Sequence, residues 1–154
     1  MFIGRAIVEQ LLLIDHCDIT LYNRGKSNIE LFPAVSRIIG DREQDDYQSI
    51  SNRWWDIVVD CSGYYPKSFI RLLAAMDGKV GRYIFISTIS VFDLGGAGMT
   101  LIDETYPTMN CHEEDAISSL PAGYGVKKSA MEQAAMISLI RRIFCAPSSA
   151  RPGR

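Results

Sequence analysis

The sequence lacks the features of a nucleic-acid-binding, metal-binding or disulfide-rich protein. Its formal net charge is −2 and its pI is about 5.7, so no global positive field is present to attract a phosphate backbone. The two histidines have no second histidine at a ligand spacing, and the four cysteines lie far apart without a C-x-x-C pair. We therefore expect reduced cysteines, no metal and no affinity for nucleic acid.

Long hydrophobic runs are also missing. No stretch approaches the roughly 18 uninterrupted apolar residues that a membrane-spanning helix needs. The apolar N-terminal stretch is interrupted by Glu9 and Asp15 and is not followed by a small-residue cleavage site, so it is not typical of a signal peptide. These absences predict a soluble, cytoplasmic protein.

The pattern that remains is an alternation of strands and helices. With 154 residues and 47% hydrophobic content, the chain has enough material for one domain, residues 1–154. Periodicity and turn residues predict strands at 18–23, 35–39, 54–61 and 82–87, and helices at 5–14, 66–76 and 124–140. This alternation favours an α/β fold, a doubly wound parallel sheet with helices on both sides. The unbroken run Ile57-Val58-Val59 predicts a strand that is covered on both faces.

A polar connection at 93–121 separates the last two predicted elements. Gly95-Gly96 and Pro107 disfavour regular structure over much of it. A loop of this length within a compact domain is usually functional or mobile, so we expect residues that select a ligand to lie there.

Two tyrosine–lysine pairs with a spacing of four residues are candidates for proton transfer. Tyr22 and Lys26 straddle a strand end and a glycine turn, so nothing holds both on one surface. Tyr124 and Lys128 begin a predicted helix, where residues four apart share a face. A neighbouring ammonium favours the phenolate, as acid–base work near neutral pH requires. The alternative for this second pair is an exposed Tyr and Lys on an amphipathic helix.

A third candidate is the strand end Ser87-Thr88, where an apolar strand terminates in hydroxyl-bearing residues. The carboxyl ends of parallel strands are where α/β sheets present side chains to ligands, and a threonine hydroxyl there can donate to a substrate carbonyl. Hydroxyls at strand ends are common, so the alternative is a purely structural role.

Together, four stretches resemble the extended short-chain dehydrogenase/reductase family, of the NAD-dependent epimerase/dehydratase type. "YIFISTISVF" is similar to the strand with the family's catalytic Ser or Thr and maps it onto Thr88, and "YGVKKSAMEQ" is similar to its Tyr-x-x-x-Lys helix. "VVDCSGY" resembles the family's fourth strand, with Ser62 and Gly63 along the dinucleotide, and "FIGRAIVEQLL" resembles the end of the glycine-rich turn and the first helix, with Gly4 as the matching glycine.

The resemblance implies a Rossmann-like domain and an NAD(P)-dependent oxidoreductase or epimerase that transfers hydride to or from a carbonyl or sugar-type substrate. Tyr124 would be the general acid/base. Lys128 would bind the nicotinamide ribose and lower the pKa of the tyrosine, and Thr88 would orient the substrate oxygen. The cofactor carries the chemistry, and the protein positions it.

The choice of cofactor depends on the end of the second family strand. It reads Asn23-Arg24-Gly25-Lys26, with two cations and no carboxylate, and an Arg at this place accommodates the 2′-phosphate of NADP. We expect NADP, with NAD as the alternative. Asp41 matches a position that often borders the adenine.

Relative to the family, the first strand, the earlier glycines and the C-terminal substrate lobe are missing from this sequence, which predicts a fragment truncated at both ends. Two other functions stay open. One is a catalytically silent NAD(P)- or RNA-binding relative, because "LYNRGKS" is similar to RNA-associated members as well. The other is a fragment that is inactive by itself.

Overall fold

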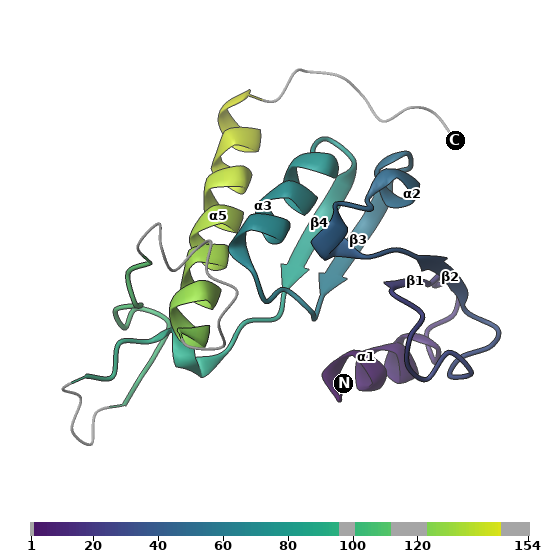
Figure 1. Cartoon of the computed structure of the whole chain (residues 1–154), viewed down its shortest axis with the longest axis horizontal. Coiled ribbons are helices and arrows are strands. Elements are labelled where there is room, and N and C mark those ends of the chain that lie inside the picture. Colours follow the sequence, from purple (N-terminus) through teal and green to yellow (C-terminus); the bar gives the residue numbers. More distant parts are fainter. Residues whose placement is uncertain (1, 96–100, 112–122, 146–154) are drawn as a thin grey trace.

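The structure is a computed structural model that describes residues 2–95, 101–111 and 123–145, with side chains described up to residue 137. Four strands are present: β1 (Thr20–Asn23), β2 (Ser36–Ile39), β3 (Trp55–Asp60) and β4 (Val80–Phe85). The α-helices are α1 (Ile3–Leu11), α2 (Gln48–Ser51), α3 (Pro66–Ala75) and α5 (Tyr124–Cys145), and the 3₁₀ turns are η1 (Arg42–Gln44) and η2 (Ile89–Val91). Figure 1 shows their arrangement.

The strands form two parallel pairs. β1 pairs with β2 in the register Thr20↔Ser36, and β3 pairs with β4 in the register Trp55↔Val80. An α/β fold with parallel strands is thereby confirmed. The expected single doubly wound sheet is not what the described residues form, because β1 and β3 each pair along one edge only and the result is two two-stranded sheets.

One hydrophobic core joins the two sheets. Its buried centre comes from α2, α3 and the start of β4, and Tyr22 of β1 and Ile38 of β2 pack against the same cluster as Val58 of β3. The indole of Trp55 donates to the Ile50 carbonyl at 2.8 Å, which fixes α2 to β3. The buried residues of this cluster are Tyr47, Ile50, Leu72, Met76 and Val80.

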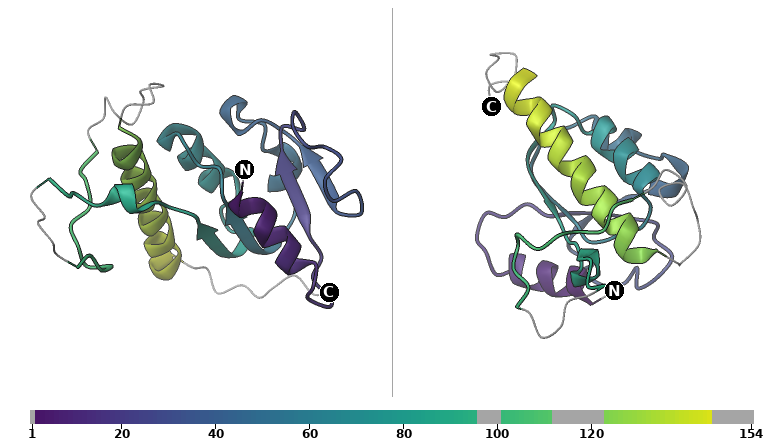
Figure 2. Two further views of the ribbon diagram at one scale, coloured as in Figure 1. Left: turned by 90° about the horizontal axis from the view of Figure 1, so that it is seen from below. Right: turned by 90° about the vertical axis from the view of Figure 1, so that its left-hand side faces the viewer.

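The helices α3 and α5 lie together on one face of the β3–β4 pair (Figure 2). Pro66 occupies the first turn of α3, where its missing N–H costs nothing. Phe69 is fully buried, with its ring 4.7 Å from that of Phe85 and 6.1 Å from that of Tyr83. These contacts anchor α3 to the sheet.

The opposite face of β3–β4 is open, which corrects the prediction of a strand covered on both faces. Ile57 is 57% exposed and Ile84 is 39% exposed, whereas Val58 and Tyr83 pack into the core. In β4, exposed and less exposed residues alternate from Arg82 to Phe85, as in a strand with one covered face. The apolar run was a poor guide because its members point alternately to the two faces.

Most predicted elements are confirmed with small shifts at their ends. The first helix begins at Ile3 instead of residue 5 and ends at Leu11, and the last helix extends to Cys145. The single-turn elements η1, α2 and η2 were not predicted, because they are too short for any periodicity. Of the predicted loop at 93–121, residues 96–100 and 112–122 lie outside the described residues. Residues 101–111 contain no helix or strand, apart from a bridge between Phe92 and Thr108.

No helix in the described part of the chain combines the length and apolar character needed to cross a membrane.

The composition of the core predicts which truncations on α3 lower the free energy of unfolding. Leu72→Ala removes a side chain that is 4% exposed, and we expect it to lower the free energy of unfolding by about 2–5 kcal/mol. Ile70→Ala on the same helix is the matched control, because Ile70 is 51% exposed and its truncation leaves no cavity. Urea unfolding followed by circular dichroism measures both. Equal losses in the two variants would contradict this assignment of the core.

Candidate functional site

The candidate site lies where the carboxyl ends of β3 and β4 meet the beginning of α5. Parallel pairing brings both strand ends to one edge. The helix α5 then packs on η2 so closely that a Cβ atom at Gly125 would lie 1.9 Å from the Ser90 carbonyl oxygen. Only glycine allows this approach, and it places Tyr124 and Lys128 beside the segment that contains Thr88.

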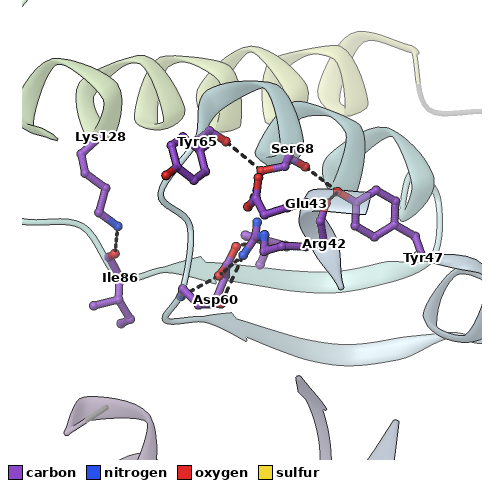
Figure 3. A network of polar contacts seen from close by, with 10 residues as sticks. Arg42, Glu43, Tyr47, Asp60, Tyr65, Ser68, Ile86 and Lys128 are labelled. Carbon is purple, nitrogen blue, oxygen red and sulfur yellow. Dashed lines mark hydrogen bonds and ion pairs between the residues drawn. The ribbon is translucent and has the colours of Figure 1, made fainter. Parts of the chain in front are cut away.

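Lys128 is buried, with 3% of the residue exposed. Its ammonium donates to the Ile86 carbonyl at 2.7 Å and lies 4.1 Å from the centroid of the Phe85 ring (Figure 3). Burial lowers the pKa of Lys128, and the negative charge of Asp60 opposes that effect. An ammonium carries three N–H donors, and the bond with Ile86 uses one of them.

Tyr124, the first residue of α5, is 40% exposed. Its ring centroid lies 6.1 Å from that of Tyr64, which belongs to the segment after β3. In the same segment, a Cβ atom at Gly63 would lie 2.8 Å from the Phe85 ring and 3.4 Å from the sulfur of Met131 on α5. Residues 61–64, called the β3 loop below, therefore pack against the face of α5 that carries Tyr124 and Lys128.

The hydroxyls at the end of β4 differ in their bonding. Thr88 Oγ1 accepts from the Ser90 amide at 3.3 Å, so it caps η2. Ser87 Oγ is buried and has no hydrogen-bond partner within the described residues. An open hollow of about 470 Å³ adjoins both residues and is lined also by Phe92, Asp103 and Glu132.

Asp60, the last residue of β3, forms a buried polar network with Arg42, Ser62 and Tyr83. Figure 3 labels Asp60 and Arg42. Its Oδ1 accepts from Arg42 Nη1 at 2.8 Å and from the Ser62 amide at 3.0 Å, and its Oδ2 accepts from the Tyr83 hydroxyl at 2.7 Å. Burial acts to raise the pKa of Asp60. The hydrogen bonds and the charge of Arg42 outweigh burial and hold the pKa below its usual range. Burial next to Asp60 raises the pKa of Tyr83.

The segment after β2 completes the network. Asp41 caps η1 by accepting from the Glu43 amide at 3.1 Å. The Tyr47 hydroxyl lies 2.6 Å from the Arg42 carbonyl and 2.9 Å from the Ser68 carbonyl, which ties η1 to α3. Hydrogen bonds therefore hold both the side chain of Arg42, through Asp60, and its backbone carbonyl, through Tyr47.

Apart from Asp41, which caps η1, the sequence-predicted residues fall into two groups. Thr88, Tyr124 and Lys128 belong to elements that pack together, α5 on η2, beside the β3 loop, which carries Ser62 and Gly63. Gly4 is the second residue of α1, and Arg24 follows β1, so both belong to the part of the molecule built from α1, β1 and β2 (Figure 1). Arg24 is exposed, and the Asn23 side chain accepts from the Gly25 amide at 3.0 Å to shape the turn around it.

Sequence reasoning missed the residues that support this group: Asp60, Cys61, Tyr64, Tyr83 and Gly125. The sequence did contain one indication for Asp60. A carboxylate at the end of an apolar strand predicts a charged or hydrogen-bonding partner, because a buried carboxylate without one is costly. Arg42 directly follows the predicted Asp41, but no local sequence pattern indicates its pairing with Asp60, 18 residues further along the chain. The close approach at Gly125 is a tertiary feature that spacing could not reveal.

No family model, curated protein or solved structure matches this chain.

Among the residues that the structure describes, no three His, Cys, Asp or Glu side chains gather in a way that could hold a metal ion. Cys17 and Cys61 are free thiols.

Gly125 provides a test of the packing that builds the site. In an ordinary helix position Gly→Ala is stabilising by roughly 1 kcal/mol, through helix propensity. Here we expect Gly125→Ala to destabilise by about 1–3 kcal/mol, because the new methyl group meets the Ser90 carbonyl. Gln133→Ala, at an exposed position of α5, is the control. Urea midpoints measure both, and a more stable Gly125→Ala variant would contradict the close approach.

Proposed function

We propose that this chain is a Rossmann-like, short-chain dehydrogenase/reductase-type domain that binds a nicotinamide dinucleotide and transfers hydride to or from a carbonyl or sugar-type substrate. The observation that carries the proposal is the meeting of Tyr124, Lys128 and the hydroxyls of residues 87 and 88 at the carboxyl ends of two parallel strands. Ligands of open α/β sheets bind beyond these ends.

The residues at this edge fit a nicotinamide nucleoside. The ammonium of Lys128 keeps donors beyond the one that Ile86 accepts, and these suit ribose hydroxyls. Ser87 Oγ is a buried hydroxyl with no partner within the described residues, so a polar ligand group there would satisfy it. For the pyrophosphate, the nearest match is the N-terminus of α1. Its N-cap residue is Phe2, and no side-chain hydrogen bond caps the first N–H groups of the helix.

Each residue then has a chemical role. The nicotinamide, when bound, supplies or accepts the hydride. The phenol of Tyr124 donates a proton to the substrate oxygen during reduction and takes it back during oxidation. Lys128 binds the ribose hydroxyls of the nicotinamide nucleoside, and the Thr88 hydroxyl orients the substrate oxygen. The hollow beside Thr88 provides room for the substrate, and Asp103 and Glu132 on its wall suit sugar hydroxyls.

The preference for NADP depends on Arg24 in this proposal. Arg24 is exposed after β1, with no carboxylate at the end of that strand. We expect Arg24→Ala to weaken NADPH binding about tenfold, the loss of one charged hydrogen bond of about 1.5 kcal/mol, and to leave NADH binding unchanged. Fluorescence titration of both nucleotides measures this.

Arg82→Ala is the control for that titration, because Arg82 is exposed on β4 and follows no strand end. Equal weakening of NADPH and NADH by Arg24→Ala would argue against contact with the 2′-phosphate. Absence of binding of either nucleotide to the unmodified chain would refute the proposed function itself.

The role of Tyr124 is tested by Tyr124→Phe, which removes only the hydroxyl. We expect turnover in a panel of nucleotide-sugar and carbonyl substrates to fall by about 10²–10⁴-fold, with NADPH affinity nearly unchanged. Tyr106→Phe is the control, because that ring packs edge-on against Phe92 and is not among the residues that line the hollow. Nucleotide binding without turnover in the unmodified chain would favour a catalytically silent binding protein.

A further inference from the structure

The Asp60 carboxylate is buried and accepts hydrogen bonds from three separate segments of the chain. Its side chain is 4% exposed, and both of its oxygens accept hydrogen bonds. The donors come from three places: Arg42 on η1, the backbone of Ser62 in the β3 loop, and Tyr83 on β4. One carboxylate therefore connects the end of the β1–β2 pair with both strands of the β3–β4 pair.

Stability alone is a poor reason for this arrangement. A buried ion pair often contributes no more than apolar residues of the same volume would, because both charges lose their hydration. Arg42 also leaves Nε and Nη2 buried without partners within the described residues, which costs further free energy. The network is therefore better explained by what it holds in place.

What it holds is the β3 loop. Asp60 binds the Ser62 amide, and Arg42 donates to the Ser62 hydroxyl at 3.3 Å. The neighbouring residues Gly63 and Tyr64 contact the face of α5 that carries Tyr124 and Lys128. A shift of Asp60 therefore moves the surface against which both candidate catalytic side chains rest.

The network also acts on Lys128 through charge. Burial lowers the pKa of Lys128, and Asp60 contributes the largest opposing effect. Arg42 lowers this pKa, and Glu132 on α5 and Cys61 in the β3 loop raise it. Removal of the Asp60 charge would leave the positive charge of Arg42 uncompensated next to the lysine.

We infer that Asp60 is a positioning residue of the proposed active site, which fixes the β3 loop against the face of α5 that carries Tyr124 and Lys128. This inference rests on the proposed function for its catalytic meaning. The physical claim concerns two side chains of the chain itself and can be measured without cofactor or substrate.

The first test is Asp60→Asn, which keeps the shape and removes the charge. Nuclear magnetic resonance of ¹³C-labelled lysine follows the titration of Lys128, assigned by its loss in Lys128→Arg. We expect the Lys128 pKa to shift downward in Asp60→Asn. Asp56→Asn is the matched control, because Asp56 is exposed on the same strand, and it should leave the titration in place. An unshifted Lys128 titration in a folded Asp60→Asn protein would overturn the inference.

The second test covers the case in which Asp60→Asn does not fold. Tyr83→Phe removes one hydrogen bond from Asp60 and changes no charge. We expect it to loosen the β3 loop and to raise the rate of Cys61 alkylation several-fold, as measured by mass spectrometry of the labelled peptide. Exposed Cys17 is the internal reference in the same sample. An unchanged rate at Cys61 would overturn the positioning role.

Activity separates this inference from the proposed function. If NADPH binds and turnover is found, Asp60→Asn should lower kcat more than it raises KM, and the alkaline limb of the pH profile should move to lower pH. A missing nucleotide affinity in the unmodified chain would refute the proposed function, while the Lys128 titration would still decide the role of Asp60.

Discussion

The parallel pairing of β3 with β4 is the constraint on which the rest of the structure depends. Parallel strands need a crossover between them, and α3 supplies it by packing Phe69 against the rings of Tyr83 and Phe85. The same pairing places the β3 loop beside the residues that follow β4. The contact of Gly63 with the Phe85 ring and the bond of Lys128 to the carbonyl after β4 both depend on that adjacency.

Buried charge is the second organising feature, and it is concentrated at this edge. Arg42 and Asp60 form an ion pair with side chains only 11% and 4% exposed, and Lys128 is buried close by. Two positive groups and one negative group share a region of low polarity, so charge and burial act against each other there. The charge of Arg42 holds the pKa of Asp60 below its usual range, and the charge of Asp60 opposes the lowering of the Lys128 pKa by burial.

The sequence was sufficient for the longer elements and insufficient for their assembly. Alternation and turn residues predicted β3, β4, α3 and α5 because each is long enough to show its period. The same rules misjudged β3, where three adjacent apolar residues suggested burial on both faces while Ile57 is exposed. Pairing of the strands into two sheets, and the link from Arg42 to Asp60, depend on contacts between distant residues. No local pattern records them.

The two tyrosine–lysine pairs show how tertiary context separates equal spacings. The Tyr22 hydroxyl donates to the Asp46 carbonyl at 2.6 Å, and burial raises its pKa to about 12. A phenol that donates to a carbonyl and has a raised pKa is poorly matched to acid–base work near neutral pH, which favours a structural role for Tyr22. Tyr124 instead lies at the mouth of the strand ends, with its lysine buried one turn along α5. The spacing is the same in both pairs, and the difference is that a glycine-dependent contact with η2 places only the second at the carboxyl ends of β3 and β4.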